Sequence, residues 1–271
     1  GESFPTETLA VRVGDEARVL LVNGFDRLNR TMRVPDYYPP TGDTHMRMFL
    51  DRMNRYDYAI QHGSAILYPF DSSSNEAVQA GLVRLNDYVV VDWILGEEST
   101  ADETLNATEQ ALLADFMNNG GALFISGSEI GWDLDYLGSA SDRAFYNTYL
   151  RARYAGDDAG TYTVAPASGS IFAGLPSFRF DAPGMYDADY PDQLPPINGS
   201  VAALVYQGGA GGTAAVQYAD GCRRLVYFGF PFETIRPEER PAVMARVMDF
   251  LDFCFPETLI TNPADNNAFN P

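Results

Sequence analysis

A short apolar run that ends on a corner of glycine and serine constrains the fold of this chain more than any other stretch. Residues 122–125 are uninterrupted apolar side chains, and the two glycines at 120–121 are typical of the end of a helix. An apolar run of this length is typical of a strand covered on both faces. Residues 126–129, two serines, a glycine and a glutamate, then turn the chain. Because ligands of open α/β sheets bind at the carboxyl ends of strands, the sequence predicts a site at this corner.

Further apolar runs alternate with helical patterns along the chain. Strands are expected over residues 17–24, 65–70, 88–95, 122–125 and 224–230. Helices are expected over residues 46–61, 75–85, 108–118, 141–154 and 241–253. This alternation predicts an α/β fold with a doubly wound, mostly parallel sheet flanked by helices. Residues 202–207 and 213–218, joined by a glycine-rich turn, are expected to add antiparallel strands late, at one edge.

The chain is expected to hold one large unit and two short ends. Residues 15–255 are predicted to form a single α/β domain, in which residues 157–198, rich in Gly, Pro, Asp and Tyr, are an elaborated loop region. Residues 28–44 carry three prolines and are expected to be loop. Residues 1–14 resemble the last strand of a fibronectin-type β-sandwich, which makes them the remnant of a preceding module or a linker. Residues 256–271 are expected to be a tail.

Composition excludes several classes of function. The 271 residues carry a formal charge of −19, so the chain as a whole repels phosphates and a nucleic-acid partner is disfavoured. All 18 basic residues are arginine, and the absence of lysine excludes a P-loop and a Schiff-base mechanism. No run of about 18 apolar residues is present, so no membrane span is expected.

Two cysteines leave two interpretations open. Cys222 opens a predicted strand, and Cys254 closes the helix that follows it. In a strand–helix unit the end of the helix returns toward the start of the strand, so a disulfide between them is geometrically allowed and would fit an oxidising compartment. Two separate buried thiols are the alternative.

Five motifs together resemble a module of secreted, multidomain bacterial proteins. They are Asn23-Gly24-Phe25-Asp26-Arg27, Phe70-Asp71-Ser72-Ser73-Ser74-Asn75-Glu76, Asp92-Trp93-Ile94-Leu95-Gly96-Glu97-Glu98-Ser99, Ser126-Gly127-Ser128-Glu129-Ile130-Gly131-Trp132-Asp133 and Gly229-Phe230-Pro231-Phe232-Glu233-Thr234-Ile235. The resemblance, which covers roughly residues 15–255, is to the module that follows fibronectin type III repeats in proteins labelled xanthan lyase, golvesin-like or N-acetylmuramoyl-L-alanine amidase. It implies a secreted, periplasmic or cell-surface protein attached to other modules, with a fibronectin type III-like module upstream.

That module is in turn similar to the class I glutamine amidotransferase-like, flavodoxin-like sheet. In that family a cysteine nucleophile lies on a strand-to-helix elbow, where this chain has Ser126 and Ser128. The family's catalytic histidine follows the nucleophile in the sequence, whereas His45 and His62, the two histidines of this chain, precede it. The resemblance therefore implies the fold without a complete family-type triad.

The first functional hypothesis is a hydrolase of amide or ester bonds in cell-wall or polysaccharide material. Ser128 or Ser126 would be the nucleophile, with Glu129 to orient or assist it. His62 would be the base, if the end of its helix reaches the elbow. Backbone N–H groups of the elbow would stabilise the oxyanion. The alternative for His62 is a structural role.

Acidic side chains follow most of the predicted strands and support a second hypothesis. The expected binding crevice is formed by Asn23, Asp26, Asp71, Asn75, Glu97, Glu98, Trp132 and Glu233. Candidate ligands for Ca²⁺ or Mg²⁺ are Asp26, Asp71, Glu97 and Glu129, and a separate calcium candidate is Asp187, Asp189 and Asp192. No other cofactor is expected. The same carboxylates could instead supply an acid and a base for glycoside chemistry, or only cap helices and bind loops.

A third hypothesis is a binding module without catalysis. Aromatic side chains near the predicted strand ends could stack on sugar rings, and they are equally suited to the core: Trp93, Trp132, Tyr136, Tyr186 and Tyr190. The partner would be a glycan or a peptidoglycan-like ligand, or another module of the same polypeptide.

Overall fold

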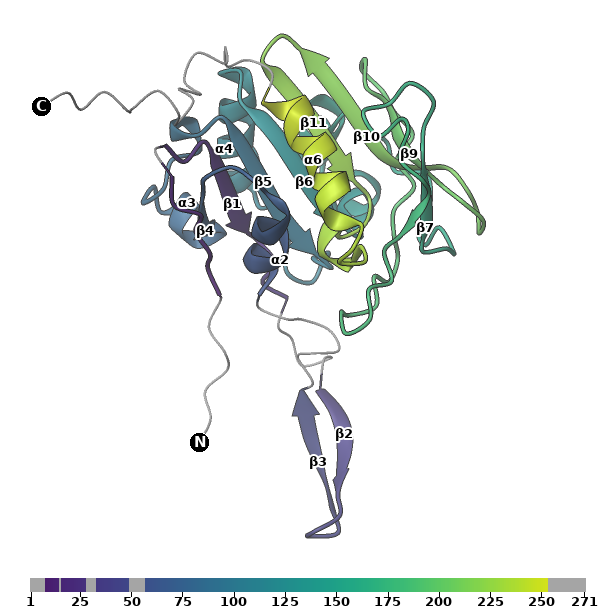
Figure 1. Ribbon diagram of the computed structural model, residues 1–271. Helices are drawn as coiled ribbons and strands as arrows, with labels where there is room; N and C mark the ends of the chain where they lie inside the picture. The colour runs from purple at the N-terminus through teal and green to yellow at the C-terminus, as the bar shows by residue number, and fades with distance from the viewer. Residues whose placement is uncertain (1–7, 15, 28–32, 49–56, 253–271) are drawn as a thin grey trace, which may run out of the picture.

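A computed structural model describes residues 8–14, 16–27, 33–48 and 57–252. One nine-stranded sheet organises the chain, in the order β4-β1-β5-β6-β11-β10-β9-β7-β8 (Figure 1). Its parallel strands are β4 (Phe70–Ser74), β1 (Val19–Asn23), β5 (Val90–Gly96), β6 (Ala122–Gly127) and β11 (Arg223–Phe228). The antiparallel strands that follow at one edge are β10 (Thr213–Asp220), β9 (Val201–Tyr206), β7 (Thr163–Pro166) and β8 (Phe178–Arg179). The predicted α/β architecture with late antiparallel strands is confirmed.

The order of the parallel strands shows where the strand order of the sheet reverses its direction. Counted in chain order, these five strands are arranged 2-1-3-4-5. The first strand, β1, therefore lies between the second and the third. The connection from β1 to β4 runs toward one edge of the sheet, and the connections from β4 to β5 and onward run toward the other. Ligands of such sheets bind at the carboxyl ends of the strands beside this reversal. The segments of interest are thus those that follow β1, β5 and β6.

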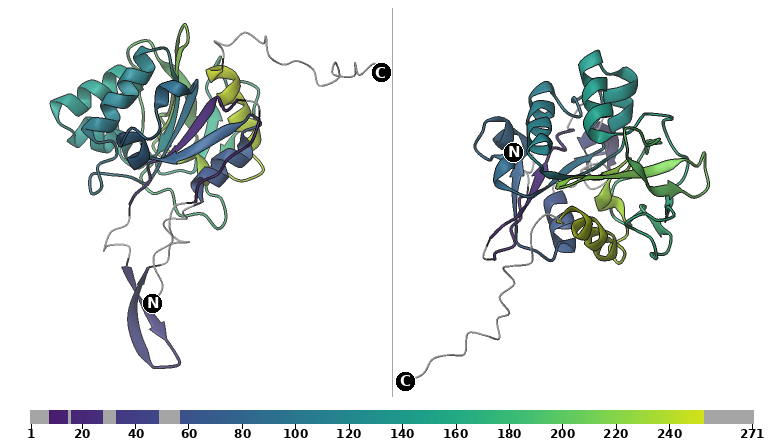
Figure 2. Two further views of the ribbon diagram at one scale, coloured as in Figure 1. Left: turned by 90° about the vertical axis from the view of Figure 1, so that its left-hand side faces the viewer. Right: turned by 90° about the horizontal axis from the view of Figure 1, so that it is seen from above.

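Helices cover both faces of the sheet, as the right-hand view of Figure 2 shows. Helices α2 (Tyr58–Ala65) and α6 (Arg240–Leu251) contact each other and lie on one face. Helices α3 (Asn75–Gln79), α4 (Ala107–Asn118) and α5 (Ala140–Phe145) lie on the other face, with two π-helical turns, η3 (Trp132–Leu137) and η4 (Tyr146–Leu150). A further short helical turn, η5 (Phe232–Thr234), follows β11, and η2 (Leu85–Asp87) precedes β5.

Alternation along the strands divides the core between the two faces. In β1, Val19 and Leu21 pack with the α6 side, whereas Leu20 and Val22 pack with the α4 side. Each side chain is at most 4% exposed, as expected for parallel strands covered on both faces. The same alternation in β5 sends Val90 to the α6 side, and the side chain two residues on, Asp92, follows it. A carboxylate therefore enters the core beneath α2.

Most predicted elements are confirmed, although the helix expected over residues 75–85 ends at Gln79, and three further predictions were wrong. Residues 33–48 form a two-stranded hairpin, β2 (Arg33–Tyr38) and β3 (Asp43–Met48), where a loop and the start of a long helix were expected. Pro35 is tolerated there because a two-stranded ribbon consists of edge strands. The helix itself, α2, begins only at Tyr58, and residues 49–56 lie outside the described residues.

The structure also differs from the predictions at residues 65–74 and 141–154. The strand expected at 65–70 is β4, which starts at Phe70, so Asp71 lies within a strand and not after one. The single helix expected at 141–154 is broken into α5 and η4, and the latter ends at Arg151 with φ +54°.

Residues 8–14 follow the edge of the sheet beside β4. Arg12 pairs with Phe70 in an antiparallel bridge, and the Ala10 N–H donates to Ser72 Oγ at 2.7 Å. The edge-strand character predicted for this segment is therefore seen locally, and its origin in a preceding module stays a prediction. The predicted tail at 256–271 lies outside the described residues.

Candidate functional site

His62 lies on α2 in the middle of the core and is completely buried. Its Nδ1 is 2.8 Å from a carboxylate oxygen of Asp92 on β5, and its Nε2 is 3.2 Å from Glu233 in η5. The Tyr186 hydroxyl donates to the other oxygen of Glu233 at 2.5 Å. We call these four residues the buried histidine cluster. Elements from both halves of the chain therefore meet at one imidazole.

The charge on the buried histidine cluster follows from this geometry. Burial alone would lower the pKa of His62, but the charges and hydrogen bonds of Asp92 and Glu233 outweigh it and raise the pKa to about 9. The ring is thus an imidazolium near neutral pH and donates from both nitrogens. Burial also raises the pKa of Asp92, although the nearby imidazolium opposes this shift. A ring that donates twice has no lone pair to accept a proton from a serine, so the expected serine–histidine pair is not formed.

Neither candidate nucleophile is positioned for catalysis. Ser126 is the penultimate residue of β6, between Ile94 and Phe228 on the adjacent strands, and Ser128 follows the strand. Both serines are completely buried. Within the described part of the chain, neither hydroxyl has a hydrogen-bond partner. A serine without a base is not activated for attack.

The residue at the strained corner of the elbow is Glu129. Its φ is +58°, a left-handed conformation that costs a residue other than glycine about 1–2 kcal/mol. The backbone of the preceding residue, Ser128, is held in place because its N–H donates to the Gly96 carbonyl at 2.8 Å. The elbow predicted at residues 126–129 is therefore present, and the side chain presented there is a carboxylate.

Glu129 belongs to a set of charged groups that follow β1, β5 and β6. It lies 3.7 Å from the guanidinium of Arg27 and accepts a hydrogen bond from Ser99. Arg27 also donates to the carbonyl oxygen of Glu97 at 2.8 Å, and its N–H donates to the carboxylate of Glu98. Three adjacent strand ends are thus joined through one arginine.

Burial is the main influence on these carboxyl groups. It raises the pKa of Glu129, raises that of Glu97 well above its usual range, and raises that of Glu98 to about 9. Glu97 accepts from the N–H of Asp189 at 3.0 Å. These acids therefore lie at a common edge, as predicted, and each is already bonded to backbone or side-chain donors.

Of the other predicted acids, Asp26 adjoins this set, because its N–H donates to the Glu98 carboxylate, whereas Asp71 lies elsewhere. Asn75 donates to Asp26 at 2.8 Å and to Glu109 at 2.9 Å, and Glu109 forms a capping box with Asn106 at the start of α4. Asp71 accepts from the Tyr88 hydroxyl at 2.9 Å on the far edge of the sheet. Sequence reasoning missed Glu109, although the pattern Asn-x-x-Glu before a helix is a recognisable signal.

The residues of the predicted crevice are therefore not all brought together in one site. Asn23 is buried at the end of β1, and Glu233 belongs to the buried histidine cluster. Within the ranges that the structure describes, no three His, Cys, Asp or Glu side chains are grouped so that they could hold a metal ion. The four predicted metal ligands are thus not brought together.

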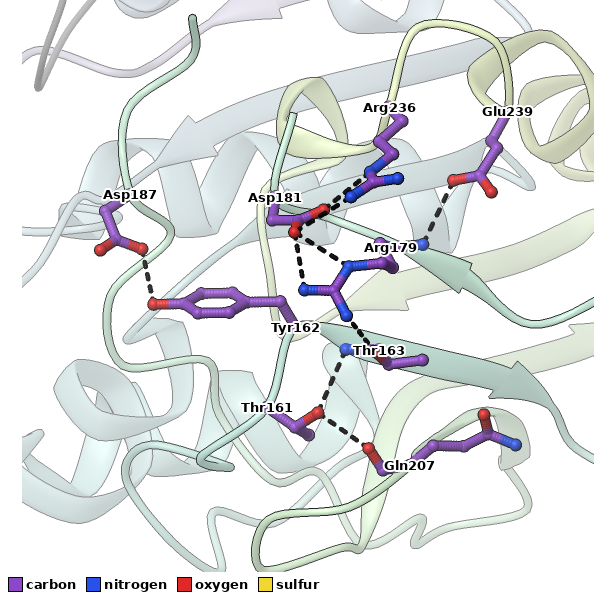
Figure 3. Close-up of polar contacts among 9 residues, drawn as sticks. All are labelled: Thr161, Tyr162, Thr163, Arg179, Asp181, Asp187, Gln207, Arg236 and Glu239. Atoms are coloured by element: carbon purple, nitrogen blue, oxygen red, sulfur yellow. Dashed lines mark hydrogen bonds and ion pairs between the residues drawn. The ribbon is translucent and has the colours of Figure 1, made fainter. Parts of the chain in front are cut away.

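The separate calcium candidate is also dispersed. Asp187 accepts a hydrogen bond from the Tyr162 hydroxyl at 2.5 Å (Figure 3). The backbone N–H of Asp189 donates to Glu97. Asp192 is completely buried and accepts from the Gly131 N–H at 2.6 Å, and burial raises its pKa well above the usual range. Gly131, two residues after the elbow, is therefore held to the loop that carries Asp192.

A second charged cluster connects the elaborated region, residues 157–198, to the segment before α6. Asp181 lies between two arginines, with Arg179 Nη2 at 2.6 Å and Arg236 Nε at 2.9 Å (Figure 3). We call these three residues the surface arginine cluster. The hydrogen bonds and charges of the arginines lower the pKa of Asp181 to about 2, against the opposing effect of burial. Glu239 accepts from the N–H of Arg179 at 3.2 Å, which extends the connection to α6.

Three aromatic side chains are in contact beside the elbow, two from η3 and one from the segment after η4. Trp132 and Tyr136 stack with ring centres 4.8 Å apart, and Tyr154 contacts both, at 5.9 and 5.3 Å. Tyr136 is 58% exposed. We call these residues the aromatic platform. Of the other aromatic candidates, Trp93 and Tyr186 are core residues and Tyr190 is exposed; Tyr154 was missed, because a strand-end pattern does not reach it.

The two cysteines are described only in part. Cys222 is disulfide-bonded, as one of the two interpretations expected. Cys254, its predicted partner, lies outside the described residues. In the described part of the chain, no helix has the length and apolar character needed to cross a membrane.

Comparisons with known proteins define the fold and not the activity. No family model matches the chain, and no curated protein matches it. A β-galactosidase from Bacillus circulans sp. alkalophilus has a similar fold, with a TM-score of 0.52 and 12% identity over 87% of this chain. The IFT52 N-terminal domain is similar over 88% of this chain, with a TM-score of 0.51 and 12% identity. The chain spans 31% of the β-galactosidase and 98% of the IFT52 domain.

Proposed function

We propose that this domain is a non-catalytic, glycan-binding module of a larger exported protein. The observation that carries the proposal is the aromatic platform, which is partly exposed and lies on the turn directly after the elbow. Aromatic rings present an apolar face with fixed geometry, and such faces suit the apolar faces of sugar rings. The platform also follows β6, at the edge where ligands of this class of sheet bind.

Charged groups beside the platform suit the hydroxyl groups of a sugar. The pKa of Tyr154 is raised by burial and by several nearby carboxylates, including Glu129, so the elbow and the platform lie close together. Arg27 offers a guanidinium, and Glu129 offers a carboxylate held at 3.7 Å from it. Ligand sites commonly combine an apolar surface with a few fixed polar groups of this kind.

A serine hydrolase with an amidotransferase-like fold is the second candidate function. The order 2-1-3-4-5 is that of flavodoxin-like sheets, and Ser126 and Ser128 lie at the end of β6 and just after it, where the amidotransferase-like resemblance implies a nucleophile. Against catalysis stand the burial of both serines and the two carboxylates on His62. The chain matches less than a third of a β-galactosidase, which fits one module within a larger protein.

The test is binding of neutral and acidic oligosaccharides to the whole chain and to Tyr136→Ala. The variant is expected to lose about tenfold in affinity, since one exposed stacking contact is removed. Tyr68→Ala is the matched control, because Tyr68 is also exposed but lies before β4, at the opposite end of the strands. Equal affinity of the two variants for the oligosaccharides would contradict the proposal that the aromatic platform binds the glycan.

A serine-directed fluorophosphonate probe separates this proposal from the hydrolase. We expect no labelling of the native chain, because neither hydroxyl is exposed or paired with a base. Labelling that disappears in Ser128→Ala or Ser126→Ala would restore the hydrolase and displace the binding module.

A further inference from the structure

A polar cavity of about 510 Å³ lies next to the aromatic platform and has no role in the function proposed above. Its lining residues are Asp135, Arg143, Asn147, Arg153, Ile197 and Asn198. Asp135 immediately precedes Tyr136, and Arg153 immediately precedes Tyr154. The N–H of Tyr154 donates to the Asp135 carboxylate at 2.8 Å, which joins the two segments. The cavity and the platform are therefore built from the same two pieces of chain.

Two arginines give this cavity a local positive charge in a strongly acidic protein. Within the described residues, the guanidinium of Arg153 makes no hydrogen bond or ion pair, although acids outnumber basic residues by 37 to 18. Arg143 donates one long bond, 3.3 Å, to the carbonyl oxygen of Asp135. Most of the donors on these two side chains are thus available to a ligand.

The other polar groups of the cavity are already ordered by the protein. The Asn147 amide donates to Asp135 at 3.2 Å and to the Arg143 carbonyl at 2.7 Å. Asp135 accepts this bond and the one from Tyr154, so its charge is partly satisfied. Asn198 donates to the carbonyl oxygen of Asn147 at 2.8 Å. The cavity wall is therefore held in place before any ligand arrives, which lowers the cost of binding.

We infer that this cavity binds the carboxylate of an acidic sugar residue in a glycan whose neighbouring ring stacks on the aromatic platform, an inference that rests on the proposed glycan-binding function. Arginine is suited to this task because its planar donors match the two oxygens of a carboxylate. The charge of −19 disfavours a densely charged polyanion, so the ligand carries an isolated carboxylate in an otherwise neutral glycan. A uronic acid residue has this chemistry.

The experiment compares two disaccharides that differ in one group. The probes are a glucuronic acid linked to glucose and the neutral disaccharide made by reducing its carboxyl group, each titrated calorimetrically into the whole chain. The acidic disaccharide is expected to bind about tenfold more tightly, the usual effect of a charge-assisted hydrogen bond. Arg153→Gln should remove this preference and leave the affinity for the neutral disaccharide unchanged.

The matched control is Arg246→Gln, which makes the same change of charge at an exposed position on α6, on the opposite face of the sheet. It should keep the preference for the acidic disaccharide. Arg143→Gln provides a second variant and should weaken binding of the acidic disaccharide alone.

The outcomes separate this inference from the proposed function. Equal affinity for the two disaccharides, or a preference that survives both Arg153→Gln and Arg143→Gln, overturns the acidic-sugar inference and leaves glycan binding intact. Failure of both disaccharides to bind, together with failure of longer oligosaccharides, overturns the proposed function and this inference with it. A preference lost in Arg153→Gln and kept in Arg246→Gln supports the inference.

Discussion

Two clusters in this molecule use the same arrangement of charges in opposite surroundings. In the buried histidine cluster one cation, His62, lies between the carboxylates of Asp92 and Glu233, with every side chain removed from water. In the surface arginine cluster one anion, Asp181, lies between Arg179 and Arg236, with these side chains between 28% and 45% exposed. The distances are similar, so the difference between the two clusters is one of burial.

Burial decides what each cluster can contribute. Charges removed from water are costly unless they are fully paired, and once paired they cannot lose a partner without leaving a charge exposed to an apolar core. Exposed ion pairs are screened by water and salt and contribute little. The buried cluster therefore fixes the position of α2 over the sheet, whereas the surface cluster only fastens an outer segment. Neither needs a catalytic explanation.

The largest expected effect is that of His62→Ala. It leaves Asp92 and Glu233 facing each other in the core, and breaking a buried pair in this way costs about 3–5 kcal/mol. Unfolding in urea measures the change. His45→Ala is the control, because His45 is exposed on β3 and its loss should cost no more than about 0.5 kcal/mol. If His62→Ala fails to fold, His62→Gln gives the same comparison with more of the hydrogen bonding retained.

Equal stability of the two histidine variants would contradict this account of the core. A His62→Ala variant that is more stable than the native chain would also contradict it. That result would mean that the buried histidine cluster destabilises the fold and is kept for a function.

The contrast between the clusters also shows what the sequence could predict. The strands β1, β5, β6 and β11 were predictable because each is built around a short, mostly apolar run. The β2–β3 hairpin was not, since Met46 also fits a helical spacing with the residues that follow and three prolines suggested a loop. Local patterns cannot decide between pairings that depend on a neighbouring strand.

The site was less predictable than the fold because its partners are distant in the chain. Asp92 is 30 residues from His62, and Glu233 is 171 residues from it. One local signal was available: a carboxylate in the middle of the apolar run of β5 must have a partner. The positive φ of Glu129 had no such signal, since glycine was available two residues earlier and would have been the expected residue for that conformation.

The next effect in size is the dependence of stability on pH, where the two clusters should respond at opposite ends of the scale. The folded pKa of His62 is about 9 against an ordinary value of 6.5. Its contribution is therefore fully present below pH 6.5 and is lost as pH rises to 9, a change of about 3 kcal/mol. The raised pKa of Glu98, also about 9, acts in the same direction. Stability should thus be higher at pH 6 than at pH 9.

The surface arginine cluster should show the reverse behaviour. The folded pKa of Asp181 is about 2 against an ordinary value of 3.8, so its contribution is present above pH 3.8 and is lost as pH falls through 2. Thermal unfolding of the native chain, His62→Gln and Asp181→Asn across pH 2–9 separates the two. His62→Gln should flatten the decline between pH 6.5 and 9 and leave the acid limb unchanged. If His62→Gln lost stability between pH 6.5 and 9 as much as the native chain does, the loss would be due to other carboxyl groups.

The smallest expected effect is that of Asp181→Asn near neutral pH. Because its two ion pairs are partly exposed, we expect a loss of at most about 1 kcal/mol, and less in 1 M salt, which screens exposed charges. Asp87→Asn is a matched control: it breaks the Arg84–Asp87 pair, in which both side chains are at least half exposed, and should cost less still. A loss of 3 kcal/mol or more in Asp181→Asn would mean that the outer segment folds cooperatively with the core. Burial would then no longer account for the difference between the two clusters.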